Sequence, residues 1–395
     1  MTTSKTTPVL SLALLSCAVS AAWAADAAYT TLDESVVSAS GYEQDTREAP
    51  ASISITTEKE LQSKPVTDLG SAVGDVPGVD VSQTKMGNST VSIRGFDAAY
   101  TLFMIDGKRQ NVSTAMIDNG FDPTSAFIPP VGMIERIEVI KGPASVLYGS
   151  DAIGGAINII TKKGGTKPIE GEVSAGMNTS ASGKNASGSI YGGIDGWKYR
   201  LSASIEDNDN LKTPKGEMEN TYFTARSVSG FLSYDFTPNT TVGASVDYYD
   251  LEFGSSDVNT PGFTVDVPKW SRFKTAAFGE FRNISDAFVR LRTDAFYQKS
   301  KKDMVNSVPG SMGSMSYVVQ PMAYNTTDQY GFSLQTDWQL GERNYLIAGY
   351  ELSYDDLSAQ SITQMTMPMM TMVMGNKLYD GYQMTNAVYA SMETQ

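Results

Sequence analysis

The sequence of 395 residues contains no histidine and one cysteine, Cys17. Without histidine the chain lacks the commonest general base and the commonest transition-metal ligand. A histidine-dependent enzyme is therefore excluded, and we expect no catalytic residue, no metal site and no cofactor. If Cys17 is removed with the apolar segment that contains it, the remaining chain has no thiol, no disulfide and no cysteine metal site.

Basic residues and long apolar runs are also scarce. The chain has 30 Lys and Arg against 44 Asp and Glu, a formal net charge of −14 at pH 7. This balance disfavours nucleic acid as a partner, because nucleic acids are bound through basic surfaces. The longest apolar run, residues 9–22, is shorter than the roughly 18 to 20 residues that a transmembrane helix needs. We therefore expect any membrane-spanning segment to consist of β-strands.

The first 24 residues have the features of a secretory signal peptide. Lys5 precedes the apolar run, and Ala22-Trp23-Ala24 matches the small-x-small pattern of a signal peptidase site. We expect Sec-dependent export and a mature chain that begins near Ala25. A lipoprotein site at Cys17 is the alternative, although the bulky residues before Cys17 fit such a site poorly.

Three zones follow: a polar tether over residues 25–44, a mixed α/β domain over 45–165, and a Tyr-, Gly- and Ser-rich zone over 166–395. The middle zone is large enough to bury a core of its own. Its predicted elements are strands over 52–55, 90–94, 102–105 and 137–140 and helices over 58–64 and 67–73.

The last zone alternates apolar and polar residues with a period of two. Trp197, Leu201 and Ile205, for example, alternate with Lys198 and Arg200. Such alternation is typical of a strand with one apolar face, and about ten such strands are predicted. A soluble β-sandwich is the alternative, because its strands alternate as well.

The connections between these strands favour a membrane barrel. Short links alternate with long ones, which is typical of outer-membrane barrels, whose short turns face the periplasm. The short links are 195–196, 237–240, 283–286 and 341–344, and the long ones are 207–224, 253–271, 300–325 and 358–381. Aromatic residues at strand ends fit the girdles at the membrane interfaces. The predicted girdle residues include Trp197, Tyr248, Tyr249, Trp270, Trp338 and Tyr354.

A long motif near the end of the middle zone resembles a known family. The run Ile134–Pro143, continued by Leu147–Ser150 and Ala152–Thr161, is similar to the plug signature of TonB-dependent receptors. Val91–Gly95 and Met104–Arg109 match the same pattern, so the resemblance covers nearly all of residues 45–165. Within the family, the chain is most similar to the colicin I receptor and the ferric-catecholate siderophore receptors.

The resemblance implies a fold class and a location: an α/β plug domain followed by the antiparallel strands of a transmembrane β-barrel in the Gram-negative outer membrane. The surroundings are then outer-membrane lipid and lipopolysaccharide, and colicins are possible partners. Barrels of the family have about 22 strands, whereas about ten are predicted here, so we expect a partial barrel and a truncated chain. Transport by such a chain alone is then in doubt.

The tether contains a segment similar to a TonB box. An extended segment of this kind is able to add as a strand to the sheet of a partner, which implies TonB as the periplasmic partner. An inert linker is the alternative. The predicted TonB-box residues are Glu34, Ser35, Val36, Val37 and Ser38.

Charged residues in the plug motifs have a family-like role as ion pairs that hold the plug to the barrel wall. A polar, reversible interface suits a plug that stays seated yet moves. The predicted residues are Arg94, Glu135, Arg136 and Glu138.

The resemblance predicts energy-coupled uptake of a ferric siderophore. Haem or cobalamin uptake by a receptor of the same family, a truncated receptor fragment without transport activity and a passive porin are the alternatives. The loop 109–128 offers one arginine against Asp118 and Asp122, which is unlike the Arg-rich apex of a catecholate receptor. The predicted substrate-binding residues are Tyr100, Arg109, Met116, Phe121 and Phe127.

A methionine cluster occupies residues 365–374, inside a predicted extracellular loop. Thioethers are soft ligands that favour Cu(I), and methionine is also common at adaptable apolar surfaces. A variable loop with an apolar lip is the preferred interpretation, and a copper site is the alternative.

Overall fold

The computed structural model describes residues 35–36, 44–45, 52–64, 66, 69–83, 89–96, 98–110, 129, 131–142, 152–214, 216–256 and 260–394. The predictions for Glu34, Val37, Ser38, Met116, Phe121 and Phe127 lie outside these residues. Among the residues described, no helix is long and apolar enough to cross a membrane. Two short strands, β1 (Ser35–Val36) and β2 (Gln44–Asp45), precede the first folded domain.

The first domain is built on a five-stranded sheet with the strand order β3-β8-β9-β6-β7. Strands β6 and β9 are parallel, and the other neighbours are antiparallel. The strands are β3 (Ser52–Thr57), β6 (Thr101–Ile105), β7 (Lys108–Arg109), β8 (Ile134–Lys141) and β9 (Gly155–Thr161). A second pair consists of β4 (Val79–Gln83) and β5 (Ser89–Ile93), and two short 3-10 helices are η1 (Ala98–Tyr100) and η3 (Val131–Met133).

Helix α2 (Glu58–Gln62) begins where the sequence supplies a cap. The Thr57 hydroxyl accepts from the Glu60 backbone N–H at 3.3 Å, and the Glu60 carboxylate accepts from the Thr57 N–H at 2.7 Å. This reciprocal capping box satisfies donors that the first helical turn leaves free. A second helix, α3 (Leu69–Val73), is buried at every residue except Ser71, which is half-buried. Both predicted helices are therefore present, although α2 ends at Gln62, two residues before its predicted end at Lys64.

The domain has its own apolar core between the sheet and the helices. Leu61, Val91, Ile137 and Ile157 are each at most 1% exposed. Strand β9 passes so close to β8 that a side chain at Gly155 would place its Cβ 2.3 Å from the Ile140 carbonyl oxygen. Burial of this kind supplies most of the stability of a small domain.

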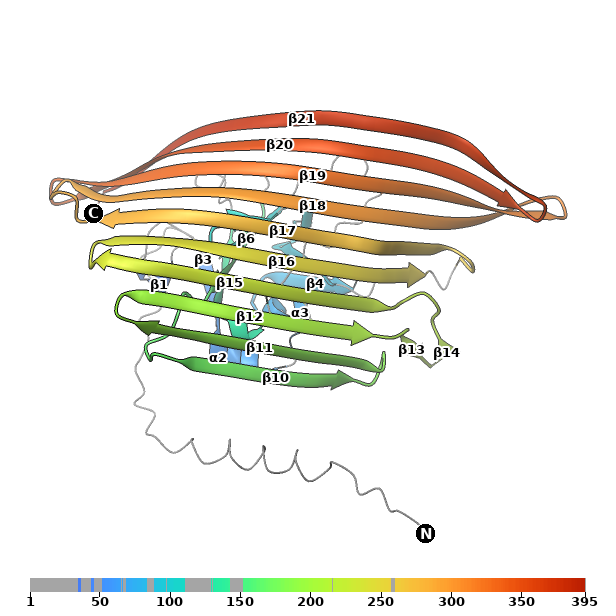
Figure 1. Cartoon of the computed structure of the whole chain (residues 1–395), viewed down its shortest axis with the longest axis horizontal. Helices are drawn as coiled ribbons and strands as arrows, with labels where there is room; N and C mark the ends of the chain where they lie inside the picture. Colours follow the sequence, from blue (N-terminus) through green and yellow to red (C-terminus); the bar gives the residue numbers. More distant parts are fainter. Residues whose placement is uncertain are drawn as a thin grey trace, which may run out of the picture. The chain divides into compact units, whose positions relative to one another are not determined.

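A ten-stranded antiparallel sheet follows, and its strands are arranged in sequence order from β10 to β21 (Figure 1). The strands are β10 (Glu170–Asn178), β11 (Gly183–Ile194), β12 (Trp197–Asn208), β15 (Phe223–Thr237), β16 (Thr240–Ser256), β17 (Thr264–Arg282), β18 (Phe288–Met312), β19 (Met315–Leu340), β20 (Asn344–Met367) and β21 (Met370–Thr394). A small hairpin of β13 (Lys212–Thr213) and β14 (Gly216–Glu217) lies in the β12–β15 connection. The predicted fold class, an α/β plug followed by the antiparallel strands of a partial barrel, is confirmed.

The two faces of the large sheet differ as the period of two predicts. On β12, Leu201 and Ile205 are 58% and 48% exposed, whereas Arg200 and Ser202 are 3% and 2% exposed. Polar side chains also pair across strands on the buried face, as between the Ser189 and Ser202 hydroxyls at 2.7 Å. An exposed apolar face opposite a polar face is the pattern of a barrel wall in lipid.

The long connections differ from the prediction. Residues 300–325 and 358–381 were expected to form loops, but they continue β18–β19 and β20–β21 as paired strands that end in two-residue turns. Gly313 has φ 63° at the first of these turns, which glycine adopts without strain. Cross-strand pairing satisfies the backbone of these segments, so they need not form irregular loops. The predicted link 253–271 likewise shortens, because β16 extends to Ser256 and β17 begins at Thr264.

Aromatic side chains form two rows on the exposed face. Phe288 stacks on Trp338 at 4.3 Å beside the short turns. A second row crosses four strands, with ring centroids 5.1, 6.4 and 6.0 Å apart, and it consists of Tyr297, Tyr330, Tyr354 and Tyr382. The two rows are separated along β18 by the residues from Phe288 to Tyr297, close to the roughly 9 to 11 residues with which a tilted strand crosses a bilayer. The rows therefore fit the two membrane interfaces.

Two of the predicted girdle residues are placed elsewhere. Tyr249 and Trp270 are 4% and 7% exposed and belong to an apolar cluster with Phe253 and Met304. Their neighbours along each strand alternate in burial, so these two side chains lie on the face opposite to Tyr248, which is 43% exposed. The prediction for Tyr249 and Trp270 is wrong because aromatic type alone does not reveal which face of a strand a residue occupies.

Candidate functional site

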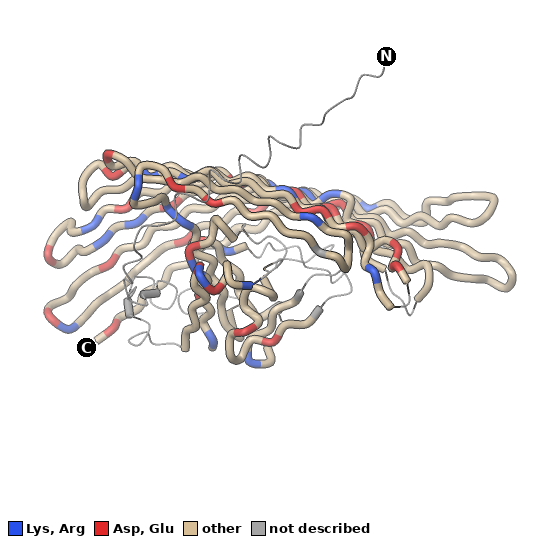
Figure 2. The backbone as a smooth tube through the Cα atoms, turned by 90° about the horizontal axis from the view of Figure 1, so that it is seen from below, with Lys and Arg blue, Asp and Glu red and all other residues tan. Residues whose placement is uncertain are grey.

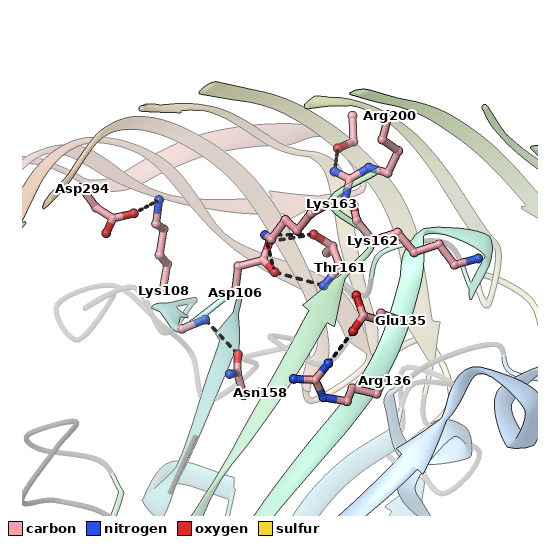
Figure 3. Close-up of polar contacts among 12 residues, drawn as sticks. Asp106, Lys108, Glu135, Arg136, Asn158, Thr161, Lys162, Lys163, Arg200 and Asp294 are labelled. Atoms are coloured by element: carbon pink, nitrogen blue, oxygen red, sulfur yellow. Dashed lines mark hydrogen bonds and ion pairs between the residues drawn. The ribbon is translucent and has the colours of Figure 1, made fainter. Parts of the chain in front are cut away.

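The turn between β6 and β7 presents polar groups of the plug to the large sheet (Figure 3). Asp106 and Gly107 have φ 53° and 74°, so the chain reverses over these two residues. The Asn158 Oδ1 accepts from the Gly107 N–H at 2.9 Å, and the Thr161 hydroxyl donates to the Asp106 carboxylate at 2.7 Å. These bonds from β9 fix the orientation of the turn.

Asp106 is held ionised by its surroundings. Burial alone would raise its pKa, but the Lys163 ammonium at 2.7 Å and the hydrogen bonds from Lys163 and Thr161 outweigh burial and lower the pKa to about 2. A carboxylate that accepts several hydrogen bonds beside a cation strongly favours its charged form. The turn therefore carries a fixed negative charge at neutral pH.

Polar contacts from Lys108 and Lys162 join the plug to the buried face of the large sheet. The Lys108 Nζ lies 3.1 Å from the Asp294 Oδ1 on β18. The Arg200 guanidinium on β12 donates to the Lys162 carbonyl at 2.7 Å and to the Ser229 hydroxyl at 2.9 Å. Both contacts are polar, and both partners are largely shielded from solvent, which makes them stronger than surface ion pairs.

Lys162 anchors the end of the plug to its neighbours. Its Nζ lies 2.8 Å from the Glu58 carboxylate at the start of α2 and 3.3 Å from the Glu172 carboxylate on β10. Burial lowers the pKa of Lys162, but the hydrogen bond and charge of Glu58 outweigh this and raise it. One lysine thus ties the first helix of the plug to the first strand of the large sheet.

The four predicted ion-pair residues are placed as follows. Arg136 pairs with Glu135 at 2.5 Å and with Glu138 at 2.8 Å, and all three belong to β8 of the plug. Burial raises the pKa of Glu135 against the attraction of Arg136. Arg94 follows β5 with φ 52° and an exposed side chain. These pairs lie within the plug, whereas the plug residues that contact the sheet include Gln62, Lys108, Lys162 and Lys163.

The predicted substrate-binding and TonB-box residues are only partly described. Tyr100 ends η1 and is 48% exposed, and Arg109 is the last residue of β7. Ser35 and Val36 form strand β1. The other predicted residues of both sites lie outside the described part of the chain.

A cavity of ≈ 380 Å³ lies between the plug turn and the buried face of strands β12 to β18. Eight Lys and Arg side chains line it against four Asp and Glu side chains. Its lining includes Lys198, Pro238 and Arg282, which are within a few residues of the short turns. This cavity is not predictable from the sequence, because its lining combines the plug turn with five strands of the large sheet.

Figure 2 shows charged residues recurring along the sheet strands, whereas the outer parts of the β18–β19 and β20–β21 hairpins carry none.

Comparison with known families identifies the first domain. Residues 45–156 match the TonB-dependent Receptor Plug Domain. The chain carries a TonB-dependent receptor plug domain. It is 50% identical over 145 residues to the iron-regulated outer membrane virulence protein of Vibrio cholerae serotype O1, a match that spans 36% of this chain and 22% of that protein. It is 33% identical over 238 residues to the vitamin B12 transporter BtuB of Vibrio vulnificus, which spans 58% of this chain and 37% of that protein.

Solved structures share the fold of the plug and sheet together. FpvA of P. aeruginosa, solved as a complex with pyoverdine and iron, superposes with a TM-score of 0.66 at 16% identity over 91% of this chain and 55% of that chain. The plug followed by a sheet with an apolar outer face places this chain in the Gram-negative outer membrane. The family with this plug consists of receptors and transporters, not enzymes.

Proposed function

We propose that this chain belongs to an outer-membrane receptor that imports a ferric siderophore with energy supplied by TonB. The observation that carries the proposal is the plug domain itself, which meets the buried face of the sheet through the Lys108–Asp294 pair and the Arg200–Lys162 hydrogen bond. A plug that closes a barrel must be displaced for a solute to pass. A small number of polar contacts allows this displacement, because water replaces such contacts at modest cost.

The energy-coupling segment in this proposal is Glu34–Ser38, acting as a TonB box. An extended segment ahead of the plug is accessible from the periplasm and offers backbone groups for strand addition. We propose in addition that Arg94, Glu135, Arg136 and Glu138 stabilise the seated plug, and that Tyr100, Arg109, Met116, Phe121 and Phe127 contact the substrate.

Iron is the preferred cargo because the 50% identical relative is named as iron-regulated. The ferric-catecholate subclass is the specific proposal, based on the plug motifs Ile105–Arg109 and Ser150–Lys163. A corrinoid is the second candidate, since the match to the vitamin B12 transporter extends past the plug into the sheet strands.

Uptake measurements on cells that produce the receptor from its own gene test the proposal. We expect radiolabelled ferric tris(catecholate) to accumulate in these cells, and accumulation to be lost on deletion of the gene, on loss of TonB or on collapse of the proton gradient. Labelled cyanocobalamin serves as the competing substrate. Uptake of cobalamin alone would transfer the proposal to the second candidate, and energy-independent entry of both solutes would contradict an energy-coupled receptor.

A further inference from the structure

The cavity between the plug and the sheet has a charge opposite to that of the chain. Lys and Arg outnumber Asp and Glu two to one in its lining, although acidic residues exceed basic residues in the chain as a whole. Several of the lining cations are paired, such as Lys163 with Asp106 and Lys198 with Asp235. Other lining cations are almost completely buried. The groups around these buried cations indicate what kind of ligand the cavity binds.

Three cations of the cavity lining are almost completely buried: Arg200, Arg272 and Lys274 are 3%, 4% and 7% exposed. The Arg200 Nε has no hydrogen-bond partner, and its other two nitrogens are bonded to a carbonyl and a hydroxyl. The Lys274 Nζ lies 4.9 Å from the ring centroid of Phe296.

Arg272 lies over the ring of Tyr249 at 5.0 Å. Within the described part of the chain, no carboxylate lies within ion-pair distance of the Lys274 ammonium. Buried charges are costly unless they are paired. Lys274 and the unbonded Arg200 Nε both belong to side chains that line the cavity, and they therefore point to an anion as the missing partner.

We propose that this cavity is a binding site for a multivalent anion, formed by Arg200, Arg272 and Lys274 on the sheet and by Lys108 and Lys163 on the plug. The site lies beside the short turns, which face the periplasm, and thus on the inner side of the plug. The cavity lining contains neither Tyr100 nor Arg109, the two described residues that we assign to substrate contact.

The ligand class follows from charge, and this step rests on the proposed function. Fe³⁺ with three dianionic catecholates is a trianion, whereas Fe³⁺ with three monoanionic hydroxamates is neutral. A cavity of ≈ 380 Å³ suits a compact chelate or a smaller multivalent anion such as phosphate. A trianionic chelate that leaves the apex would meet this cluster before it reaches the periplasm, and a neutral one would gain nothing from it.

Thiol labelling tests the site without knowledge of the ligand. The mature chain is expected to contain no cysteine, so Ser245→Cys places a single thiol in the cavity lining. An anionic sulfonate thiosulfonate and a cationic trimethylammonium thiosulfonate are compared on the purified receptor. We expect the anionic reagent to be favoured about tenfold over its preference at the exposed hairpin residue in Ser311→Cys, because a cationic cleft concentrates anions.

Substitutions at Lys274 test whether its buried ammonium causes the preference of the cavity thiol for the anionic reagent. Lys274→Met should abolish most of the preference, and Lys274→Arg should preserve it. Lys301→Met removes the same charge from an exposed position on β18 and should leave it unchanged. The proposal is overturned if the cavity thiol reacts with neither reagent, if its preference equals that of the hairpin thiol, or if Lys274→Met has no effect.

Protection then separates the two anion sources. Ferric tris(catecholate) and inorganic phosphate are each tested for slowing of the labelling of the Ser245→Cys receptor, with a neutral ferric tris(hydroxamate) as the control. Protection by the trianionic chelate supports a site on the transport path, and protection by phosphate alone supports a site for a free anion. Equal protection by the neutral chelate, or none by either anion, overturns the anion site. Labelling does not depend on uptake. A receptor that fails to import iron would therefore refute the proposed function, but the labelling experiment would still test the anion site.

Discussion

The Nζ of Lys108 lies 3.1 Å from the Oδ1 of Asp294 and joins the β6–β7 turn of the plug to strand β18. Asp294 also accepts from the Arg292 Nε at 2.9 Å, so one carboxylate serves a cation of the plug and a cation of the sheet. Loss of the plug cation leaves the carboxylate paired, whereas loss of the carboxylate leaves two cations with one partner fewer.

This asymmetry predicts unequal effects on plug seating. Asp294→Asn should favour the unseated plug more than Lys108→Met, and the double-mutant cycle should give a coupling free energy of about 1 kcal/mol. A thiol placed at Ala156, which is fully buried in the plug, reports unseating or unfolding of the plug through its labelling rate in urea. Equal effects of the two single substitutions, with no coupling, would show that this pair does not hold the plug.

The stability of the plug should depend on pH through Asp106. Its pKa is lowered to about 2 in the folded protein, below an unfolded value near 4, so the folded state binds the proton less tightly. The stabilisation is therefore complete above about pH 4 and is lost as the pH falls towards 2. Its size is at most about 2.5 kcal/mol, because one pKa unit corresponds to about 1.4 kcal/mol.

Residues 45–165 contain Asp106 and its partners Thr161 and Lys163, so the plug alone suffices for this measurement. We expect it to fold as a soluble monomer with a cooperative melt, because its core is self-contained. Asp106→Asn should flatten the dependence of the melting temperature on pH between 2 and 4, whereas Asp80→Asn, at an exposed position of β4, should not. A plug that aggregates or stays unfolded would contradict the expectation of an independent domain.

Two glycines of the plug should tolerate alanine very differently. In Gly155→Ala the new Cβ would lie 2.3 Å from the backbone oxygen of Ile140, which cannot move without breaking the β8–β9 ladder. We expect a loss of about 3 kcal/mol or more in unfolding free energy. In Gly95→Ala the new Cβ would have no neighbouring atom within 4 Å, so only the φ of 78° is unfavourable for alanine. We expect this substitution to lower the unfolding free energy by about 1 kcal/mol. Urea unfolding of the plug measures both, and similar losses would argue against the close β8–β9 packing.

Val36→Pro should separate binding from transport. Proline removes an amide donor and fixes φ, so strand addition of Glu34–Ser38 to TonB should fail while the extracellular surface is untouched. We expect energy-dependent uptake of ferric tris(catecholate) to be lost and its binding to de-energised cells to be retained. Ala28→Pro, in the same tether, is the control and should transport normally. Full uptake by the Val36→Pro receptor would identify the segment as a linker.

The elements of the fold were predictable because each has a local signal. Strand β12 alternates residue by residue from Trp197 to Ile205, and the plug strands near Ile105 and Ile137 are short apolar runs that end at polar or glycine residues. Parallel pairing of β6 with β9 was not predictable, since it joins residues that are more than fifty positions apart. The long hairpins were missed because methionine, serine and proline are weak strand formers on their own, and pairing with a neighbour overrides this preference.

The site was harder to predict than the fold. The sequence shows that Arg200 and Arg292 are charged residues on predicted strands. It does not show their partners, because these depend on which strands the plug turn approaches. Lys108 and Lys162 belong to family-like motifs, yet nothing in their spacing distinguishes a contact with the sheet from a solvated charge. The pairing of Arg136 with two neighbours on its own strand likewise follows from the geometry of β8 rather than from residue type.

The position of the tyrosine row from Tyr297 to Tyr382 also indicates which methionines are most accessible to an oxidant outside the membrane. From Tyr354, strand β20 continues for thirteen residues to Met367, about 40 Å at roughly 3.3 Å per residue. If the row marks the outer interface, the hairpin tip stands well clear of the lipid, with Met369 99% exposed. Hypochlorite or peroxide would convert these thioethers to polar sulfoxides. The damage would fall on an uncharged tip, while Met104 and Met133, at most 2% exposed inside the plug, would be spared.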